Sequence, residues 1–256
     1  MIDSRAIIDP TAKLAADVEV GPWSIIGPGV EIDAGTVIGP HVVVKGPARI
    51  GRNNRIFQFS SIGEDCQDKK YKGEPTQLVV GDNNIFREGC TVHRGTVQDN
   101  GITVIGSNNL FMANAHVAHD CVVGDDNILA NNAAIAGHVK MGDHIILGGF
   151  TAVHQFCHIG SYSMCGAGTV VLKDIPAFVM SNGNSAQPHG INSEGLRRRG
   201  FSAEAIRSIR QAYKVIYRSG LKVDEALARL RIMAVATPEI QLMVDSLEAS
   251  DRGIIR

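Results

Sequence analysis

The chain of 256 residues has few aromatic side chains, almost no net charge and no long apolar stretch. Phe, Trp and Tyr make up only 5% of the sequence, so small and β-branched residues must fill most of any core. The formal net charge of −1 creates no overall field that would attract nucleic acid or a membrane surface. No apolar run approaches the roughly 18 residues of a transmembrane helix, and the N-terminus MIDSRAIIDP lacks a signal-peptide pattern.

Cysteine is also sparse and irregularly spaced. The five cysteines form no CxxC pair and no regular pattern, which disfavours a disulfide framework: Cys66, Cys90, Cys121, Cys157 and Cys165. We therefore expect free thiols and a cytoplasmic protein without a transmembrane segment.

What the sequence does have is an apolar residue at every sixth position. The series runs from Ile8 to Ile62, returns from Val80 to Val92 and, after a slip of one residue, runs from Ile105 to Val171. All 25 positions are apolar in a sequence that is 44% apolar. A period of six fits neither a helix nor an isolated strand. It predicts a solenoid in which each hexad supplies one short strand and one corner, and three hexads close a triangular coil.

The corners of such a coil need backbone with positive φ, which glycine and asparagine tolerate. We expect this role for the Gly residues and for the Asn pairs at 53–54, 83–84, 108–109 and 131–132. Two segments break the hexads, at about 63–79 and 93–101, and are predicted to leave the coil as loops. Loops on a rigid solenoid often carry function.

After the hexads end, the pattern becomes helical. We expect a β-helix over 1–190 and an α-helical domain over 191–256, with Ser202 capping one helix, a second over about 223–236 and a third starting at Thr237. Residues 197–222 contain eight Lys or Arg and one acidic residue, Glu204. This basic segment is either a solvated helix face or a docking surface for an acidic partner, such as a carrier protein.

Three histidines recur at nearly one coil length. His119, His138 and His154 are 19 and 16 residues apart, so they should lie near one edge of the prism. Such a cluster suits either a metal site or a general base with an orienting neighbour. Asp120 could orient His119, and Gly137, one coil away, could offer a backbone N–H to an oxyanion.

Several segments then resemble one family, the bacterial UDP-N-acetylglucosamine O-acyltransferases of lipid A synthesis. The resemblance covers essentially the whole chain, and its most selective segments are QDKKYKGEP (67–75), TVHRGTV (91–97), NAHVAHDC (114–121), LANNAAIAGHV (129–139), TAVHQFC (151–157) and EGLRRRGFS (194–202). It implies a left-handed parallel β-helix, a homotrimer with sites between subunits, and acyl carrier protein and UDP-N-acetylglucosamine as substrates. It implies no metal and no cofactor.

The resemblance also implies roles for individual residues. His119 resembles the general base that activates the 3-hydroxyl of the sugar, Asp120 its support and Gly137 the oxyanion donor. Other positions resemble substrate contacts: Asp68, Lys70, His116, His138, His154, Gln155, Asn192, Glu194, Arg198 and Arg199. Ala167 corresponds to the floor that limits acyl length, where Gly admits a longer chain. Ser185 departs from relatives that carry His, which leaves a nucleotide contact there in doubt.

Two other interpretations use the same scaffold. A zinc-dependent enzyme similar to trimeric carbonic anhydrases would employ the histidines as metal ligands, but would leave the helical tail and basic segment without a purpose. A non-enzymatic binding solenoid would need no base at all.

Overall fold

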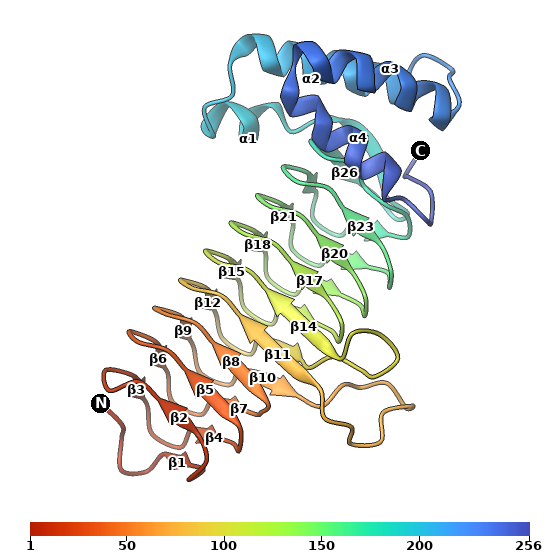
Figure 1. Ribbon diagram of the computed structural model, residues 1–256. Helices are drawn as coiled ribbons and strands as arrows, with labels where there is room; N and C mark the ends of the chain where they lie inside the picture. Colours follow the sequence, from red (N-terminus) through yellow and green to blue (C-terminus); the bar gives the residue numbers. More distant parts are fainter.

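The computed structural model describes all residues, 1–256, as a triangular prism of stacked coils with helices at its C-terminal end (Figure 1). Nearly every coil contributes one short parallel strand to each of three sheets, here named A, B and C. Sheet B contains β1 (Ile7–Ile8), β4 (Ile25–Ile26), β7 (Val43–Val44), β10 (Ser61–Glu64), β13 (Thr91–His93), β16 (His116–Val117), β19 (Ala134–Ile135), β22 (Ala152–Val153) and β25 (Val170–Val171).

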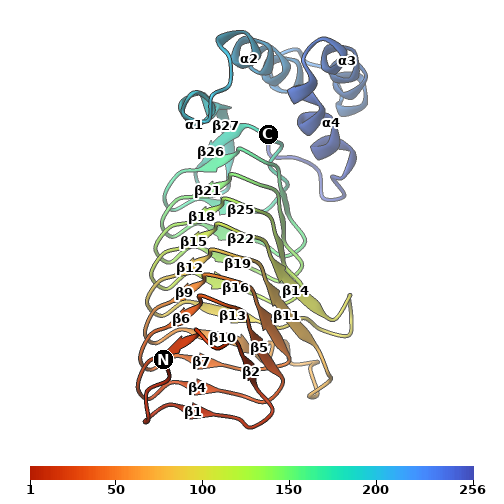
Figure 2. The ribbon, with the colours of Figure 1, turned by 60° about the vertical axis from the view of Figure 1, so that its left-hand side comes forward.

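The chain passes from sheet B to sheet C and then to sheet A within each coil (Figure 2). Sheet C contains β2 (Lys13–Leu14), β5 (Val30–Ile32), β8 (Ala48–Ile50), β11 (Gln77–Val80), β14 (Ile102–Ile105), β17 (Val122–Val123), β20 (Lys140–Met141) and β23 (His158–Ile159). Sheet A contains β3 (Glu19–Val20), β6 (Val37–Ile38), β9 (Arg55–Ile56), β12 (Ile85–Phe86), β15 (Leu110–Phe111), β18 (Ile128–Leu129), β21 (Ile146–Leu147), β24 (Met164–Cys165), β26 (Val179–Asn182) and the antiparallel β27 (Gln187–Ile191).

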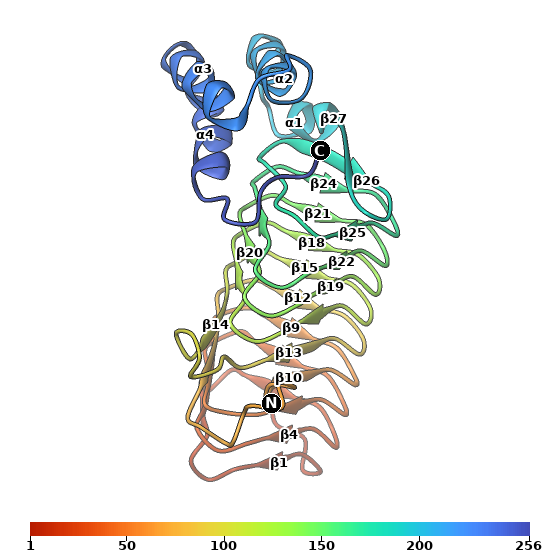
Figure 3. The ribbon, with the colours of Figure 1, turned by 90° about the vertical axis from the view of Figure 1, so that its right-hand side faces the viewer.

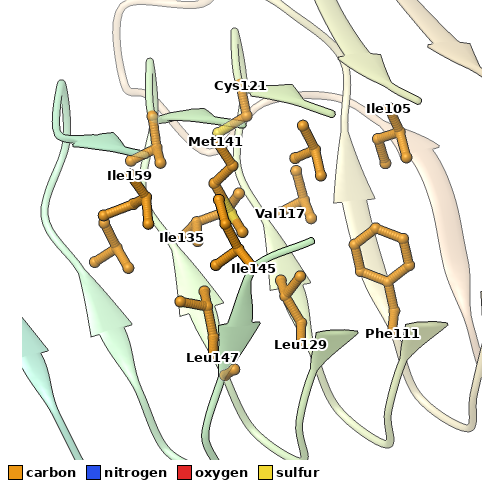
Figure 4. Packing of buried hydrophobic residues seen from close by; sticks show 14 of the residues in the cluster. Ile105, Phe111, Val117, Cys121, Leu129, Ile135, Met141, Ile145, Leu147 and Ile159 are labelled. Carbon is orange, nitrogen blue, oxygen red and sulfur yellow. The ribbon is translucent and has the colours of Figure 1, made fainter. Parts of the chain in front are cut away.

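The hexad residues form the core of the prism. From Val20 to Val171 every predicted inward position is buried, and only Ile8 and Leu14 in the first coil are half-exposed. In the middle coils, residues such as Phe111, Leu129 and Leu147 converge from one sheet onto Val117 and Ile135 from another (Figure 4). Phe86 and Phe111 stack with ring centroids 4.7 Å apart. The packing explains how so few aromatic residues suffice, because the interior of each coil is narrow.

The corners are built partly as expected. Backbone with positive φ occurs at Asn53, Asn83, Asn108 and Asn132, but also at large aromatic residues such as Phe150. The expectation that both members of each asparagine pair adopt positive φ is wrong, because only one member of each of the four pairs does. It is also wrong for glycines such as Gly27 and Gly51, which lack positive φ; a Cβ at Gly51 would instead lie 2.7 Å from the Gly81 carbonyl oxygen of the next coil. In three of the pairs the second asparagine, together with Asn127, forms a buried ladder that bonds coil to coil: Asn54, Asn84 and Asn109.

Two loops leave the same corner of the prism. Residues 65–76 connect β10 to β11, and residues 94–101 connect β13 to β14, so both emerge between sheets B and C in consecutive coils. All views show them side by side on this edge, here named the BC corner (Figure 3). The next coil places the segment between β16 and β17 at that corner, directly beyond the two loops.

Helices follow the last strand: α1 (Ser193–Arg198), α2 (Ala203–Tyr217), α3 (Val223–Ala236), the 3₁₀ helix η1 (Pro238–Ile240) and α4 (Gln241–Glu248). Ser202 caps α2 as predicted, accepting a hydrogen bond from the Ala205 N–H. The helix expected to start at Thr237 begins as a 3₁₀ turn, and Thr237 gives it no side-chain cap. The C-terminus returns to the prism, where the buried Asp174 accepts a hydrogen bond from Ser250.

The asparagine ladder should contribute measurably to stability. Asn109 donates to the Gly124 carbonyl and accepts from the Asn127 N–H, at 2.9 and 2.8 Å. Asn109→Ala would leave both groups buried and unpaired, and we expect a loss of about 2–3 kcal/mol in unfolding free energy. Urea denaturation at fixed protein concentration measures it. Asn108→Gly is the matched control, because Asn108 has φ 61° and glycine accepts that conformation; an equal loss in both variants would contradict the prediction.

Candidate active site

The register of the coils determines which residues meet at the BC corner. Because His116 pairs with Ala134 and Ala134 with Ala152, position 119 aligns with 137 and then with 155. His119 therefore lies beside Gly137, followed by Gln155. Asp120, His138 and Phe156 form the adjacent column, and all three have positive φ at the corner.

His119 is held by a carboxylate and lies against backbone. Its Nδ1 is 2.8 Å from Oδ2 of the buried Asp120. An ionised carboxylate only accepts, so Nδ1 carries the proton and Nε2 keeps a free lone pair. Gly137 is required here, because a Cβ at that position would lie 2.6 Å from Nε2 of His119. An imidazole oriented by a carboxylate in this way suits general-base chemistry.

Asp120 is fixed from the neighbouring coil. Thr96, in the loop of residues 94–101, donates to Asp120 through its N–H at 2.8 Å and its hydroxyl at 2.6 Å. Burial acts to raise the pKa of the Asp120 carboxyl, but the hydrogen bonds from His119 and Thr96 outweigh it and keep this pKa below its ordinary value. Asp120 is therefore ionised at neutral pH. Thr96 was not predicted, since it lies in a loop where the periodicity gives no register.

His138 lies next to this pair and has its own carboxylate. Its Nδ1 is 2.9 Å from Oδ2 of Asp99, its ring centroid is 5.0 Å from that of His119, and it stacks on Phe156 at 4.4 Å. The other ring nitrogen is 3.9 Å from Asp120. Asp99 is a second residue that sequence reasoning missed, for the same reason as Thr96.

Two further histidines on sheet B are held neutral. Burial, and then the neighbouring His116, lower the pKa of His93 to about 4, and burial also lowers the pKa of His116. His116 Nδ1 lies 2.7 Å from the Thr91 hydroxyl. His93 and His116 therefore add no positive charge to the floor of the site near pH 7.

A cavity of about 470 Å³ opens beside His119. It is lined by predicted site residues, by His93 and Gln67, and by the small side chains of sheet B; the predicted residues in the lining are Asp68, His116, His119, Gly137 and Gln155. Gly137 lines this cavity, and its N–H has no hydrogen-bond partner in the chain. The remaining sheet B residues around the cavity are mostly alanine, which leaves room for an apolar chain along its outer face.

Other predicted residues lie elsewhere. His154 is at the BC corner but exposed, its side chain bonds only to the Gln155 carbonyl at 3.1 Å, and it does not line the cavity. Lys70 is exposed in the first loop. Ala167 is exposed between β24 and β25, at the corner of sheets A and B, and Ser185 is exposed in the turn before β27.

The remaining four predicted residues line a second cavity, of about 800 Å³, over sheet A. They are Asn192, Glu194, Arg198 and Arg199, facing the apolar outer side chains Ile128, Ile146, Met164 and Met180. Asn192 caps α1 and donates to the Tyr162 carbonyl, which fixes the start of this helix on the prism. Within one chain the predicted residues thus fall into two groups on two different faces.

One group of donor atoms is close enough to hold a metal ion. His119, Asp120 and His138 each offer one ligand atom within 4.8 Å of the others. In this structure the Nδ1 atoms of both imidazoles are engaged by carboxylates, as described above. The geometry of these three residues is therefore compatible with either a base or a metal ligand set.

Comparisons with known proteins point to one family. Residues 174–255 match the family described as UDP-N-acetylglucosamine O-acyltransferase, domain 2, and residues 102–137 match the bacterial transferase hexapeptide repeats. An acyl-[acyl-carrier-protein]–UDP-N-acetylglucosamine O-acyltransferase of Stutzerimonas stutzeri is 61% identical over 256 residues, covering 100% of this chain and 99% of the relative. The chain belongs to the UDP-N-acetylglucosamine O-acyltransferase family.

Solved structures agree along the whole chain. The UDP-N-acetylglucosamine O-acyltransferase of Moraxella catarrhalis superposes with a TM-score of 0.98 at 50% identity, covering 100% of this chain and 99% of that one. The Bacteroides fragilis UDP-N-acetylglucosamine acyltransferase gives 0.97 at 41%, covering 100% of both. The predicted fold, a left-handed parallel β-helix followed by α-helices, is confirmed, and so is the predicted enzyme class, an acyltransferase. No helix is long and apolar enough to cross a membrane.

Proposed function

We propose that this acyltransferase moves a 3-hydroxyacyl chain from acyl carrier protein to the 3-hydroxyl of UDP-N-acetylglucosamine, the first step of lipid A synthesis, with His119 as general base. The observation that carries the proposal is the Asp120–His119 pair, whose free Nε2 lies over Gly137 at the edge of the cavity. The family name supports the substrates, and the geometry supports the mechanism.

The reaction follows from the arrangement of these groups. Nε2 of His119 takes the proton of the sugar hydroxyl as its oxygen attacks the thioester carbonyl carbon. The imidazolium that forms is stabilised by Asp120, and the unpaired N–H of Gly137 is available to the oxyanion. The C–O bond forms, the C–S bond breaks, and the thiol leaves with the proton. No acyl-enzyme is needed, because all five cysteines are buried and burial raises the thiol pKa of each.

The other site residues recognise the substrates in this proposal. Asp68 and Lys70 on the first loop, with His116, His138, His154 and Gln155, contact the sugar and the acyl donor. Asn192, Glu194, Arg198 and Arg199 approach from another face, where two guanidinium groups suit phosphate oxygens. The thioester is carried by the phosphopantetheine arm of the carrier, so the reaction needs no metal and no cofactor of the enzyme.

The separation of these two groups supports a homotrimer with shared sites. The outer side chains of sheet A are largely apolar and half-buried, and its two charged ones, Glu19 and Arg55, lie in the N-terminal half. Those of sheet C include four charged residues, at positions 13, 31, 49 and 140. The apolar set on sheet A is Val37, Ile85, Leu110, Ile128, Ile146, Met164 and Met180. If sheet A of one copy packs against sheet B of the next, three copies close a ring. The Asn192–Arg199 group of one subunit then faces the His119 cavity of its neighbour.

The basic segment supports docking of the acidic carrier protein in the cytoplasm. Arg207, Arg210, Lys214, Arg218 and Lys222 are all exposed on or next to α2. Arg210, Lys214 and Arg218 also border a cavity of about 360 Å³ with His189. These exposed cations, which lie close to Arg198 and Arg199 in the sequence, would bind the acidic carrier protein while its phosphopantetheine arm reaches the cavity beside His119.

His119→Ala tests the mechanism. Removing the base should lower kcat for acyl transfer by at least about 10²-fold, while the affinity for UDP-N-acetylglucosamine measured by calorimetry changes little. His158→Ala is the control, since His158 lies on the outer face of sheet C. Substantial transfer by the His119 variant, or stoichiometric zinc in the active wild-type enzyme, would contradict the proposal.

Leu110→Glu tests the subunit arrangement. A charge in the centre of the apolar outer face of sheet A should shift the protein from the trimer, at three times the 27.4 kDa chain mass, toward monomers and abolish transfer. Analytical ultracentrifugation measures the mass. Val122→Glu places the same charge on the 41% exposed outer position of sheet C and should leave the trimer intact; dissociation by Val122→Glu alone would contradict the arrangement.

Ala167 sets the expected acyl length. It lies 48 residues beyond His119, about 2.7 coils or roughly 13 Å along the prism at one strand spacing per coil. Its methyl group should make the enzyme prefer a medium-length chain, shorter than relatives with Gly accept. Rates with C10, C12 and C14 hydroxyacyl carrier proteins measure this preference, and Ala167→Gly should move it to longer donors. A wild-type preference for C14 or longer would contradict it.

A further inference from the structure

The loop of residues 65–76 is tied to the prism by one side chain. Apart from the bond between the neighbours Asp65 and Glu64, every hydrogen bond that joins this loop to the rest of the chain comes from Arg94. Its guanidinium forms an ion pair with Asp65 and donates to the Tyr71 hydroxyl at 3.1 Å. These two partners lie at the start and the middle of the loop.

Arg94 is unusual because its charge is buried. Its side chain is 7% exposed, and Nη1 donates to the Gly63 carbonyl, the residue just before the loop, at 2.5 Å. Its Nε is buried without a partner. A buried charge with an unsatisfied donor lowers stability, so a gain elsewhere must offset the cost of burying the Arg94 guanidinium. All the hydrogen-bond partners of Arg94 lie at residues 63–71, which indicates that the gain is the fixing of the loop.

The contacts continue from Arg94 to a residue that lines the cavity. The Tyr71 hydroxyl also donates to the Glu74 carbonyl at 3.0 Å, and the Tyr71 N–H donates to the Asp68 carbonyl. The Asp68 carboxylate accepts from the Lys70 N–H at 2.9 Å and lies in the cavity lining beside His93. Tyr71 thus holds the turn that carries Asp68 and Lys70 by a hydrogen bond, and Arg94 in turn holds the Tyr71 hydroxyl.

We propose that Arg94 is a positioning residue for substrate recognition: it fixes the loop of residues 65–76 through Asp65 and Tyr71, so that Asp68 and Lys70 meet the bound sugar nucleotide. The proposal rests on the proposed function for its substrate, and assigns Arg94 no contact with it. Its neighbour Thr96 acts on a different part of the site, since it holds Asp120.

The test uses the full-length enzyme with Arg94→Lys and Tyr71→Phe. Lysine keeps the charge but cannot bond Gly63, Asp65 and Tyr71 together, because it lacks the guanidinium fork. Tyr71→Phe removes one link and leaves the ion pair. Arg87→Lys is the matched control, since Arg87 pairs with Glu88 on the surface of the same prism. Thermal denaturation of each variant shows whether the prism remains folded.

Two readouts separate positioning from a general structural effect. Trypsin should cleave after Lys69, Lys70 or Lys72, as identified by mass spectrometry, about tenfold faster in Arg94→Lys and to a smaller degree in Tyr71→Phe. The KM for UDP-N-acetylglucosamine should rise about tenfold in Arg94→Lys, with kcat within about threefold of wild type. The control should change neither. The cleavage readout needs no activity, so it tests Arg94 even if the proposed reaction is wrong.

Three outcomes would overturn the proposal. Unchanged loop cleavage and KM in a folded Arg94→Lys variant would show that the loop does not depend on this residue. A fall in kcat with unchanged KM would indicate an effect on the Thr96–Asp120–His119 chain instead. If Arg94→Lys does not fold, Tyr71→Phe decides, and wild-type cleavage and KM in that variant would refute the proposal.

Discussion

The whole structure depends on the burial of one apolar side chain every six residues inside a narrow prism. Because three hexads make one coil, the register of the parallel strands aligns residues 18 positions apart, and this alignment extends to the corners. It brings His119 beside Gly137, and Asp120 beside His138 and Phe156. The site is therefore a consequence of core packing: a slip of one residue in a strand would turn core side chains outward and separate His119 from Gly137.

The periodic part of the chain could be predicted from the sequence because its side chains repeat. The inward series, the shared edge of the histidines and the Ser202 cap all follow from local spacing. Spacing does not distinguish two structural roles that use the same residue type, as the asparagines show. Of each of three asparagine pairs, one member turns the corner and the other is in the buried ladder, because only the second side chain points into the prism.

The loops mark the limit of that reasoning. Thr96 reaches Asp120 across 24 residues and Asp99 reaches His138 across 39, and neither separation is a multiple of a coil. Such contacts depend on how an irregular segment folds back on the corner. His154 shows the opposite error: its spacing from His119 falls one residue short of two full coils, so it lies outside the column of His119 and stays exposed. The family resemblance pointed to residues in both cavities and implied sites between subunits, but it did not indicate which of these residues lie on which face of the chain.

The architecture thus divides two physical tasks. The coils hold His119, Gly137 and the alanine-lined surface of sheet B rigidly, since displacing any of them would disrupt strands on both sides. The loops provide polar groups around this rigid set. Thr96 donates to the Asp120 carboxylate, Asp99 bonds His138, and Asp68 contributes to the lining of the cavity. Both loops leave from consecutive coils at the corner that the next coil fills with His119. An interruption of the hexads at another corner would remove the same number of core residues from the coil, but its loop would contact none of these site residues. The site therefore explains why both loops leave the prism at the BC corner.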